Sequence, residues 1–213
     1  MRLLRSDQQN TRTAVLFRLS FLLTIAVTSL IYPMARAQRG PQTASADLDY
    51  LVQRAGTIVR GNVISAKVEP HPQFANLQTV AVSIAVSNVL KGTAPPTYTF
   101  RQFLLDASDA SDTGGYRKAG ELLLLLNPVS QYGLTSPVGM DQGRFRVVRD
   151  RQGKAIAING RSNIGLFDQL TNKAAARGVS LSPRAQAMLA KPANQASLDS
   201  LEDTIAALVG AGR

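Results

Sequence analysis

The chain contains no cysteine, and it has only one histidine among its 213 residues. Without cysteine it cannot form disulfides, zinc–thiolate sites, iron–sulfur clusters or a thiol nucleophile, and it cannot carry a lipid on an N-terminal cysteine. A single histidine argues against a Ser-His-Asp site and excludes a metal site built from several histidines. That residue, His71, lies between Pro70 and Pro72, and we expect it to be an exposed turn residue. The residue types therefore predict no metal site and no cofactor.

The composition is that of a folded globular protein. Hydrophobic residues make up 45% of the chain and charged residues 18%, whereas disordered chains have fewer apolar residues and a larger net charge per residue. The length allows one domain of ordinary size with at most a small appendage. Because disulfides are excluded, packing of the core has to hold the fold, and a chain of this length buries enough surface to do so.

Residues 1–37 have the features of a signal peptide. Four arginines lie in the first eighteen residues, residues 21–32 are almost all apolar, and Ala35 and Ala37 give the small-x-small pattern of a cleavage site. An uncleaved membrane anchor is the alternative, but only 17 residues separate Arg18 from Arg36, and a spanning helix needs about 20 apolar residues. We therefore predict cleavage near Ala37, an extracytoplasmic location (periplasmic or secreted), and no membrane-spanning segment after cleavage.

Much of the positive charge belongs to this segment. Its removal takes away five arginines and one aspartate, so the formal charge of +10 falls by four. An exported chain without cysteine fits a bacterial envelope or secreted protein best.

The rest of the chain divides by composition into three parts. Residues 38–46 are rich in Gln, Gly, Pro, Thr and Ser and predict a flexible leader. Residues 47–170 carry a strand-rich pattern after a short helix over 48–55 that Asp47 caps. Residues 171–213 predict a helical C-terminal tail. In that tail Ser182-Pro183 begins one helix, and Ser197 or Ser200 begins a last helix with apolar residues at helical spacing.

Strands are predicted from alternation and from short apolar runs. Residues 79–87 alternate branched apolar and small polar side chains, which is typical of a strand with one buried face. Gly61 predicts a bend or a bulge in a long strand. The five leucines of 122–126, which Gly120 and Pro128 flank, indicate a strand buried on both faces. The remaining predicted strands are 57–68, 98–105, 144–148 and 154–158, the last two forming a hairpin. The predicted fold class is α+β, with a small, mostly antiparallel OB-like β-barrel or coiled sheet, a short N-terminal helix and C-terminal helices.

Three segments carry a resemblance to a known family. Residues 57–64 after the short helix, the strand that ends Val89-Leu90-Lys91-Gly92, and the segment 120–125 together resemble the layout of netrin-like domains and tissue inhibitors of metalloproteinases. About residues 48–148 are covered. The layout is also similar to that of uncharacterised exported bacterial proteins, which carry a segment like Gln142-Gly143-Arg144-Phe145. The resemblance implies an OB-type barrel. The protease-inhibiting function does not carry over, because the chain lacks the N-terminal cysteine that chelates the protease zinc.

The acidic loop is the first candidate for chemistry. Asp112-Thr113-Gly114 matches the triplet of aspartic proteases, but Ala110-Ser111 precede it instead of an apolar strand, and a second aspartate would have to come from another copy. Asp106, Asp109 and Asp112 recur at every third residue, whereas calcium loops space their ligands at every second residue. A solvated loop is therefore expected, and an exported hydrolase that uses these carboxylates is the alternative function.

A basic group around the predicted hairpin is the second candidate. It carries a net charge of +5 over eighteen residues, with Asp150 as its only acid, and it consists of Arg144, Arg146, Arg149, Arg151, Lys154 and Arg161. Such a group attracts an anionic envelope component or an acidic protein. Nucleic acid is not expected as a partner, because export separates the chain from it and no aromatics alternate with the arginines. The alternative is an exposed hairpin that its charges keep soluble. The sequence thus predicts a non-enzymatic exported binding or structural protein.

Overall fold

The structure is a computed structural model, and it describes residues 44–105 and 107–211. The predicted signal peptide and residues 38–43 of the predicted leader lie outside the described residues. The strands are β1 Thr57–Pro70, β2 Gln78–Lys91, β3 Thr97–Phe103, β4 Glu121–Leu126, β5 Arg144–Arg149 and β6 Ala155–Asn159. The α-helices are α2 Leu48–Arg54, α3 Ala107–Ser111, α4 Leu170–Ala176, α5 Pro183–Leu189 and α6 Leu198–Gly210. Three short 3-10 helices complete the description: η1 Thr113–Gly115, η2 Met140–Gly143 and η3 Ala193–Gln195.

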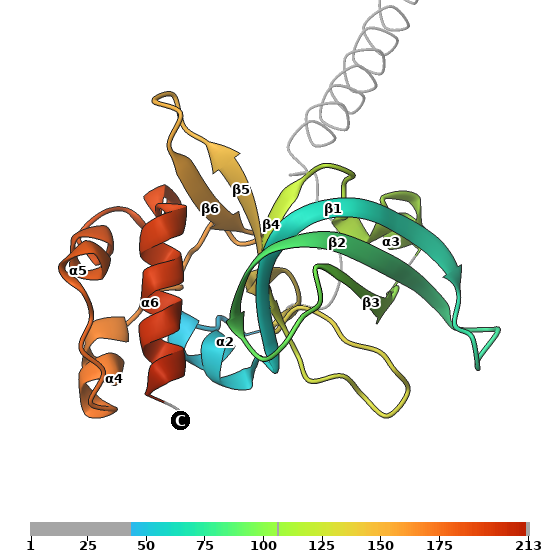
Figure 1. Ribbon diagram of the computed structural model, residues 1–213, viewed down its shortest axis with the longest axis horizontal. Coiled ribbons are helices and arrows are strands. Elements are labelled where there is room, and N and C mark those ends of the chain that lie inside the picture. Colours follow the sequence, from blue (N-terminus) through green and yellow to red (C-terminus); the bar gives the residue numbers. More distant parts are fainter. Residues whose placement is uncertain (1–43, 106, 212–213) are drawn as a thin grey trace, which may run out of the picture. The chain divides into compact units, whose positions relative to one another are not determined.

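The six strands form one antiparallel sheet in the order β3-β2-β1-β4-β5-β6. The chain is therefore α+β, as predicted. Figure 1 shows β1 and β2 as long, strongly curved strands. The OB-like barrel is not confirmed, because the sheet is open. Within residues 44–105 and 107–211, the two outer strands β3 and β6 do not pair with each other.

Loops meet the two outer strands. The Thr135 N–H, in the loop after β4, donates to the Arg101 carbonyl on β3 at 2.9 Å. At the other end of the sheet, the Ala157 N–H on β6 donates to the Ala196 carbonyl at 3.0 Å, and Ile156 forms an isolated bridge with Ser197. Each edge is thus partly covered by backbone that belongs to no strand, which limits pairing with another chain.

The predicted bulge at Gly61 is confirmed. The register of β1 against β2 shifts between Arg60 and Gly61, so that Ser87 has no partner in the ladder. A Cβ atom at Gly61 would lie 2.3 Å from the carbonyl oxygen of Ala85. Only glycine therefore allows the two strands to approach this closely where β1 bends.

The leucine run of β4 separates two apolar clusters. Leu123 and Leu125 belong to a cluster that also contains residues of α2, β5 and α6. Leu122, Leu124 and Leu126 belong to a second cluster with residues of β1, β2 and β3. All five leucines are at most 5% exposed, which confirms a strand buried on both faces.

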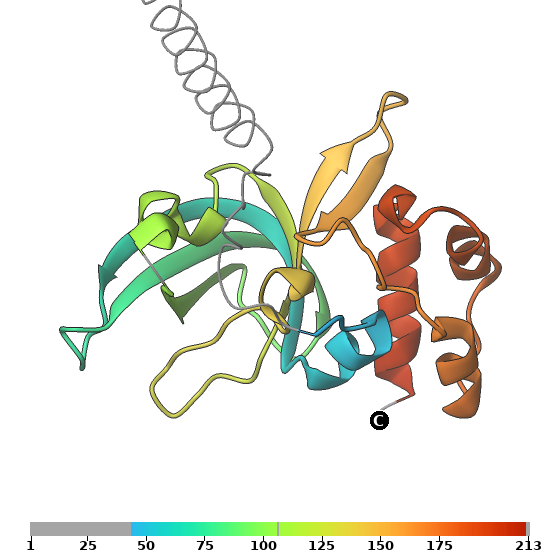
Figure 2. The same cartoon turned by 180° about the vertical axis from the view of Figure 1, so that it is seen from behind.

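The last helix packs on the chain's own core. Its four periodic apolar residues lie in the same cluster as Leu48 and Leu51 of α2, and they are Leu198, Leu201, Ile205 and Leu208. Figure 2 shows α4, α5 and α6 gathered beside α2. Arg60 on β1 also holds α6, because it donates to Glu202 at 2.8 Å and to Glu121 on β4 at 2.8 Å. Of the helices described here, none is long and apolar enough to cross a bilayer.

The predicted helix starts are found at their caps. The Asp47 carboxylate accepts a hydrogen bond from the Tyr50 N–H at 2.9 Å, and the Ser182 hydroxyl accepts one from the Ala185 N–H at 3.1 Å. Helix α6 begins after Ser197. The Ser197 hydroxyl donates to the Ser200 hydroxyl at 2.7 Å and does not cap the helix.

Candidate functional site

The basic group lies on a β-hairpin, as predicted, except for Arg161, which follows β6. The Asp150 N–H donates to the Lys154 carbonyl at 2.9 Å, and Gly153 has a φ of 78° in the turn. One oxygen of the Asp150 carboxylate accepts from the N–H groups of Gln152 and Lys154 at 2.8 and 2.9 Å. These hydrogen bonds to backbone groups hold the turn at the tip of the hairpin. They do not involve the side chains of Arg151 and Lys154, which are exposed to solvent.

A hollow of about 410 Å³ lies at this tip. It is lined by Asp150, Arg151, Gln152, Lys154, Ile156 and Lys191. Lys191 follows helix α5 and is far from the hairpin in sequence. The cluster of basic residues in the hairpin sequence therefore did not indicate that Lys191 lies beside them. Three cations and one carboxylate therefore surround the same space, and the field in it favours an anion.

Arg144 has a different role from the other cations. Its guanidinium lies 4.9 Å from the ring centre of Tyr116, bonds to Asp141 at 2.5 Å, and donates to the Gly114 carbonyl. Its side chain is only 17% exposed. Arg144 therefore fixes the loop of residues 112–116 against β5, and it is not available to a ligand at the hairpin tip.

Tyr116, below Arg144, is buried and 1% exposed. Its hydroxyl donates to the Gln102 side chain at 2.8 Å. Burial raises the pKa of Tyr116 above its ordinary value of 10.0, and the nearby charge of Arg144 offsets part of this effect. The phenol is thus held in its neutral form as a structural hydrogen-bond donor.

The remaining predicted cations lie on different faces. Arg146 is paired with Ile158 and is exposed, whereas Arg149 is paired with Ala155 on the opposite face and donates to the Gly153 carbonyl at 3.0 Å. Arg161 follows β6, and its backbone N–H donates to the Asn159 side chain at 3.0 Å. The structure therefore gathers Arg151 and Lys154 with Lys191, and it places the others elsewhere.

The described part of the acidic loop shows no cluster of metal-ligating side chains. Among the residues the structure describes, no group of three or more histidine or acidic side chains is placed to hold a metal ion. Asp106 lies outside the described residues, Asp109 accepts from the Leu105 N–H at 3.2 Å, and Asp112 is exposed just before η1. The Asp112-Thr113-Gly114 triplet is thus part of the tight turn that Arg144 holds.

His71 lies in the turn between β1 and β2, as predicted, but the prediction that it is exposed is wrong. The side chain is 4% exposed, its Nδ1 accepts from the Gln73 N–H at 3.1 Å, and its Nε2 contacts the Tyr132 carbonyl at 2.9 Å. Because Nδ1 is the acceptor, Nε2 carries the proton and donates to Tyr132. The ring also stacks on Phe74 with 5.0 Å between ring centres. The loop after β4, which contains Tyr132, covers the turn between β1 and β2. The sequence around His71 does not indicate this contact, because Tyr132 is remote in sequence.

No known protein family, curated protein or solved structure matches the chain.

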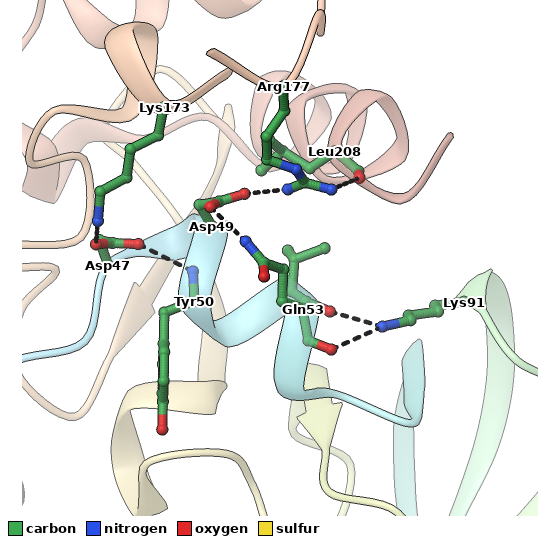
Figure 3. Close-up of polar contacts among 9 residues, drawn as sticks. Asp47, Asp49, Tyr50, Gln53, Lys91, Lys173, Arg177 and Leu208 are labelled. Carbon is green, nitrogen blue, oxygen red and sulfur yellow. Dashed lines mark hydrogen bonds and ion pairs between the residues drawn. The ribbon is translucent and has the colours of Figure 1, made fainter. Parts of the chain in front are cut away.

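A second cluster of charged residues joins α2 to α4, α6 and β2 (Figure 3). Asp49, which is 6% exposed, pairs with Arg177 and accepts from Gln53 at 2.6 Å. Arg177 also donates to the Leu208 carbonyl at 3.2 Å, near the end of α6. Asp47 pairs with Lys173 of α4, and its hydrogen bond raises the pKa of that lysine.

The Lys91 ammonium completes this cluster at the C-terminal end of α2. It donates to the carbonyls of Val52 and Gln53 at 2.8 and 3.2 Å (Figure 3), where a cation complements the helix dipole. Burial, and then the charge of Arg177, lower the pKa of Lys91. Each charged side chain drawn in Figure 3 has a partner within the chain, so the cluster holds the helices together.

Proposed function

We propose that this chain is an exported, non-enzymatic binding protein that holds an anionic partner at the tip of the β5–β6 hairpin. The observation that carries the proposal is the position of Lys191 beside Arg151 and Lys154 around one hollow. Among the residues that line the hollow, only Asp150 is acidic, and its carboxylate accepts hydrogen bonds from the backbone of its own turn. The partner class is an anionic envelope component or an acidic protein.

Export is part of this proposal, and residues 1–37 support it. The arginines, the apolar stretch and the alanine pattern near Ala37 are those of a cleaved export signal. Mass spectrometry of the protein isolated from the envelope or the medium is expected to find a chain that begins at Gln38. An intact Met1 form in the cytosol would contradict export.

We also propose that the sheet is an open version of the OB-like arrangement. Its support is the strong curvature of β1 and β2 (Figure 1) and the hydrogen bond from Thr135 to β3, through which the loop after β4 reaches across the open side. An experimental structure with a flat sheet would contradict this.

Binding is tested with a soluble polyanion. The full chain is titrated with polyglutamate at low and high salt, next to the triple variant Arg151→Gln/Lys154→Gln/Lys191→Gln. A matched control, Lys67→Gln/Arg117→Gln/Lys118→Gln, removes the same charge from other exposed positions. We expect salt-sensitive binding that is lost only in the hairpin variant. Equal losses in both variants would show that net charge alone matters and would refute the hairpin as the site.

A further inference from the structure

One face of the β5–β6 hairpin carries aliphatic side chains that belong to neither core. Val148 is paired with Ile156, and Arg146 with Ile158, so these four side chains share a face. The opposite face holds Phe145 and the residues that pack on the core with it. Val148 is 37% exposed, and Ile156 and Ile158 are half-buried. We call Val148, Ile156 and Ile158 the aliphatic strip.

Cations lie beside this strip along the hairpin and at its tip. Arg146 lies within the same face, and the hollow lined by Arg151, Lys154 and Lys191 includes Ile156 of the strip. Figure 1 shows the tip of the hairpin extending away from the neighbouring strands and helices. Apolar and cationic groups are thus presented together on one projecting part of the described chain.

We propose that the hairpin docks on the surface of an anionic lipid bilayer. This proposal rests on the proposed function, and it names the anionic partner. The aliphatic strip enters the boundary between headgroups and acyl chains, while Arg146, Arg151, Lys154 and Lys191 contact lipid phosphates. Long basic side chains suit this position because their alkyl stems lie on apolar surface while their charged ends reach the headgroups.

The size of the surface favours a bilayer over an acidic protein. A stable protein–protein interface buries about 800 Å² on each partner, whereas the strip consists of three side chains on two strands. Membrane binding has no such threshold, because each basic residue and each inserted apolar group adds its own increment. Pure charge attraction would also leave the aliphatic strip without a role.

The first test measures binding of the full chain to vesicles of equal parts phosphatidylcholine and phosphatidylglycerol. Each basic side chain at an anionic surface changes the affinity by about fivefold, so Arg151→Gln/Lys154→Gln/Lys191→Gln is expected to weaken binding by about a hundredfold. The control Lys67→Gln/Arg117→Gln/Lys118→Gln is expected to change it by no more than about fivefold. Circular dichroism and urea unfolding of each variant establish that the fold is kept.

The second test addresses the aliphatic strip. Val148→Thr/Ile156→Thr keeps the β-branched shape and every charge, and Ile64→Thr/Val89→Thr makes the same change at exposed positions of β1 and β2. We expect only the hairpin variant to lose vesicle binding, by about tenfold or more, while its polyglutamate binding stays unchanged. Equal vesicle binding by both variants would overturn the insertion of the strip.

A third test locates the contact, and the lack of native cysteine makes it simple. An environment-sensitive fluorophore on Gln152→Cys at the hairpin tip is expected to shift to the blue with anionic vesicles. The same label on Asn76→Cys, in the turn between β1 and β2, is expected to show no shift. A shift at Asn76 alone would overturn the proposed orientation.

The outcomes separate this inference from the proposed function. If the hairpin cations are needed for polyglutamate but not for vesicles, the partner is an acidic protein and the lipid inference fails alone. If they are needed for neither ligand, both the lipid inference and the proposed function fail.

Discussion

Arg177 and Asp49 form an ion pair although 128 positions separate them in the sequence. Asp49 lies in the first turn of α2, where a negative charge complements the helix dipole. Arg177 follows α4 and also bonds to the end of α6 (Figure 3). One guanidinium therefore joins three helices that are remote in sequence.

Arg177→Met is expected to destabilise the protein strongly, because it leaves the nearly buried Asp49 carboxylate without its cation. Loss of one partner of a buried pair costs about 3 kcal/mol; since the Arg177 side chain is 25% exposed, we expect about 2 kcal/mol. Urea unfolding measures the change. Arg54→Gln, at an exposed site on helix α2, which carries Asp49, is the control, with an effect below about 0.5 kcal/mol. Equal effects of the two substitutions would contradict a structural role for the pair.

Arg144 and Arg146 are expected to behave differently although they are two residues apart on one strand. Arg144→Gln removes the contacts with Tyr116, Asp141 and Gly114 and should lower the unfolding free energy by about 1–3 kcal/mol. Arg146→Gln should change it by less than about 0.5 kcal/mol, because Arg146 is exposed. Thermal and urea unfolding of the two variants test this. Similar stabilities would show that Arg144 does not hold the turn.

Tyr116 makes stability depend on alkaline pH. Its pKa in the folded state is raised above 10.0, so above pH 10.0 the unfolded chain loses a proton that the folded chain retains. The contribution is complete below pH 10.0 and declines as the pH rises, by at most about 1.4 kcal/mol per pH unit. Urea unfolding between pH 9 and 11 should therefore show a shallower decline for Tyr116→Phe than for the wild type. Parallel curves would contradict the raised pKa.

Gly61→Ala is expected to destabilise the pair of β1 and β2. The added methyl would lie 2.3 Å from the Ala85 carbonyl oxygen, so the strands have to move apart, at a cost of about 2 kcal/mol or more. Gly210→Ala is the matched control, because a Cβ there meets no atom within 4 Å and alanine favours the helix. Unfolding midpoints compare the two. A neutral Gly61→Ala would mean that the bulge is not tightly packed.

Loss of His71 is expected to loosen the β1–β2 turn. In His71→Ala the Gln73 N–H loses its acceptor and the Tyr132 carbonyl loses its donor, which should cost about 1–3 kcal/mol. Hydrogen exchange at the Gln73 amide should accelerate, while amides in α6 keep their relative protection. Unchanged exchange at Gln73 would contradict the hydrogen bond to Nδ1.

The sequence predicted those elements whose signals are local. Alternation along 79–87, the caps Asp47 and Ser182, and the glycine of the 150–153 turn depend on neighbouring residues, and the structure confirms each of them. The leucine run was likewise correctly assigned, because its length and flanking residues limit it to a strand.

The features that depend on distant residues were not predictable in this way. His71 is buried by Tyr132 and its loop, and closure of the sheet depends on whether β3 meets a further strand, which local patterns do not specify. Lys191 is remote from the hairpin in sequence, and it lies beside Arg151 and Lys154 only in the folded chain. The resemblance to netrin-like domains stays a prediction.

The core shared by α2 and α6 constrains when the protein can finish folding. A polypeptide that is delivered amino end first, from a ribosome or a translocase, presents Leu48 and Leu51 long before Leu201 and Ile205 emerge to cover them. Arg60 likewise forms its ion pair with Glu202 only once α6 is present. The native contacts of α2 and Arg60 with α6 therefore form only after the residues of α6 are available.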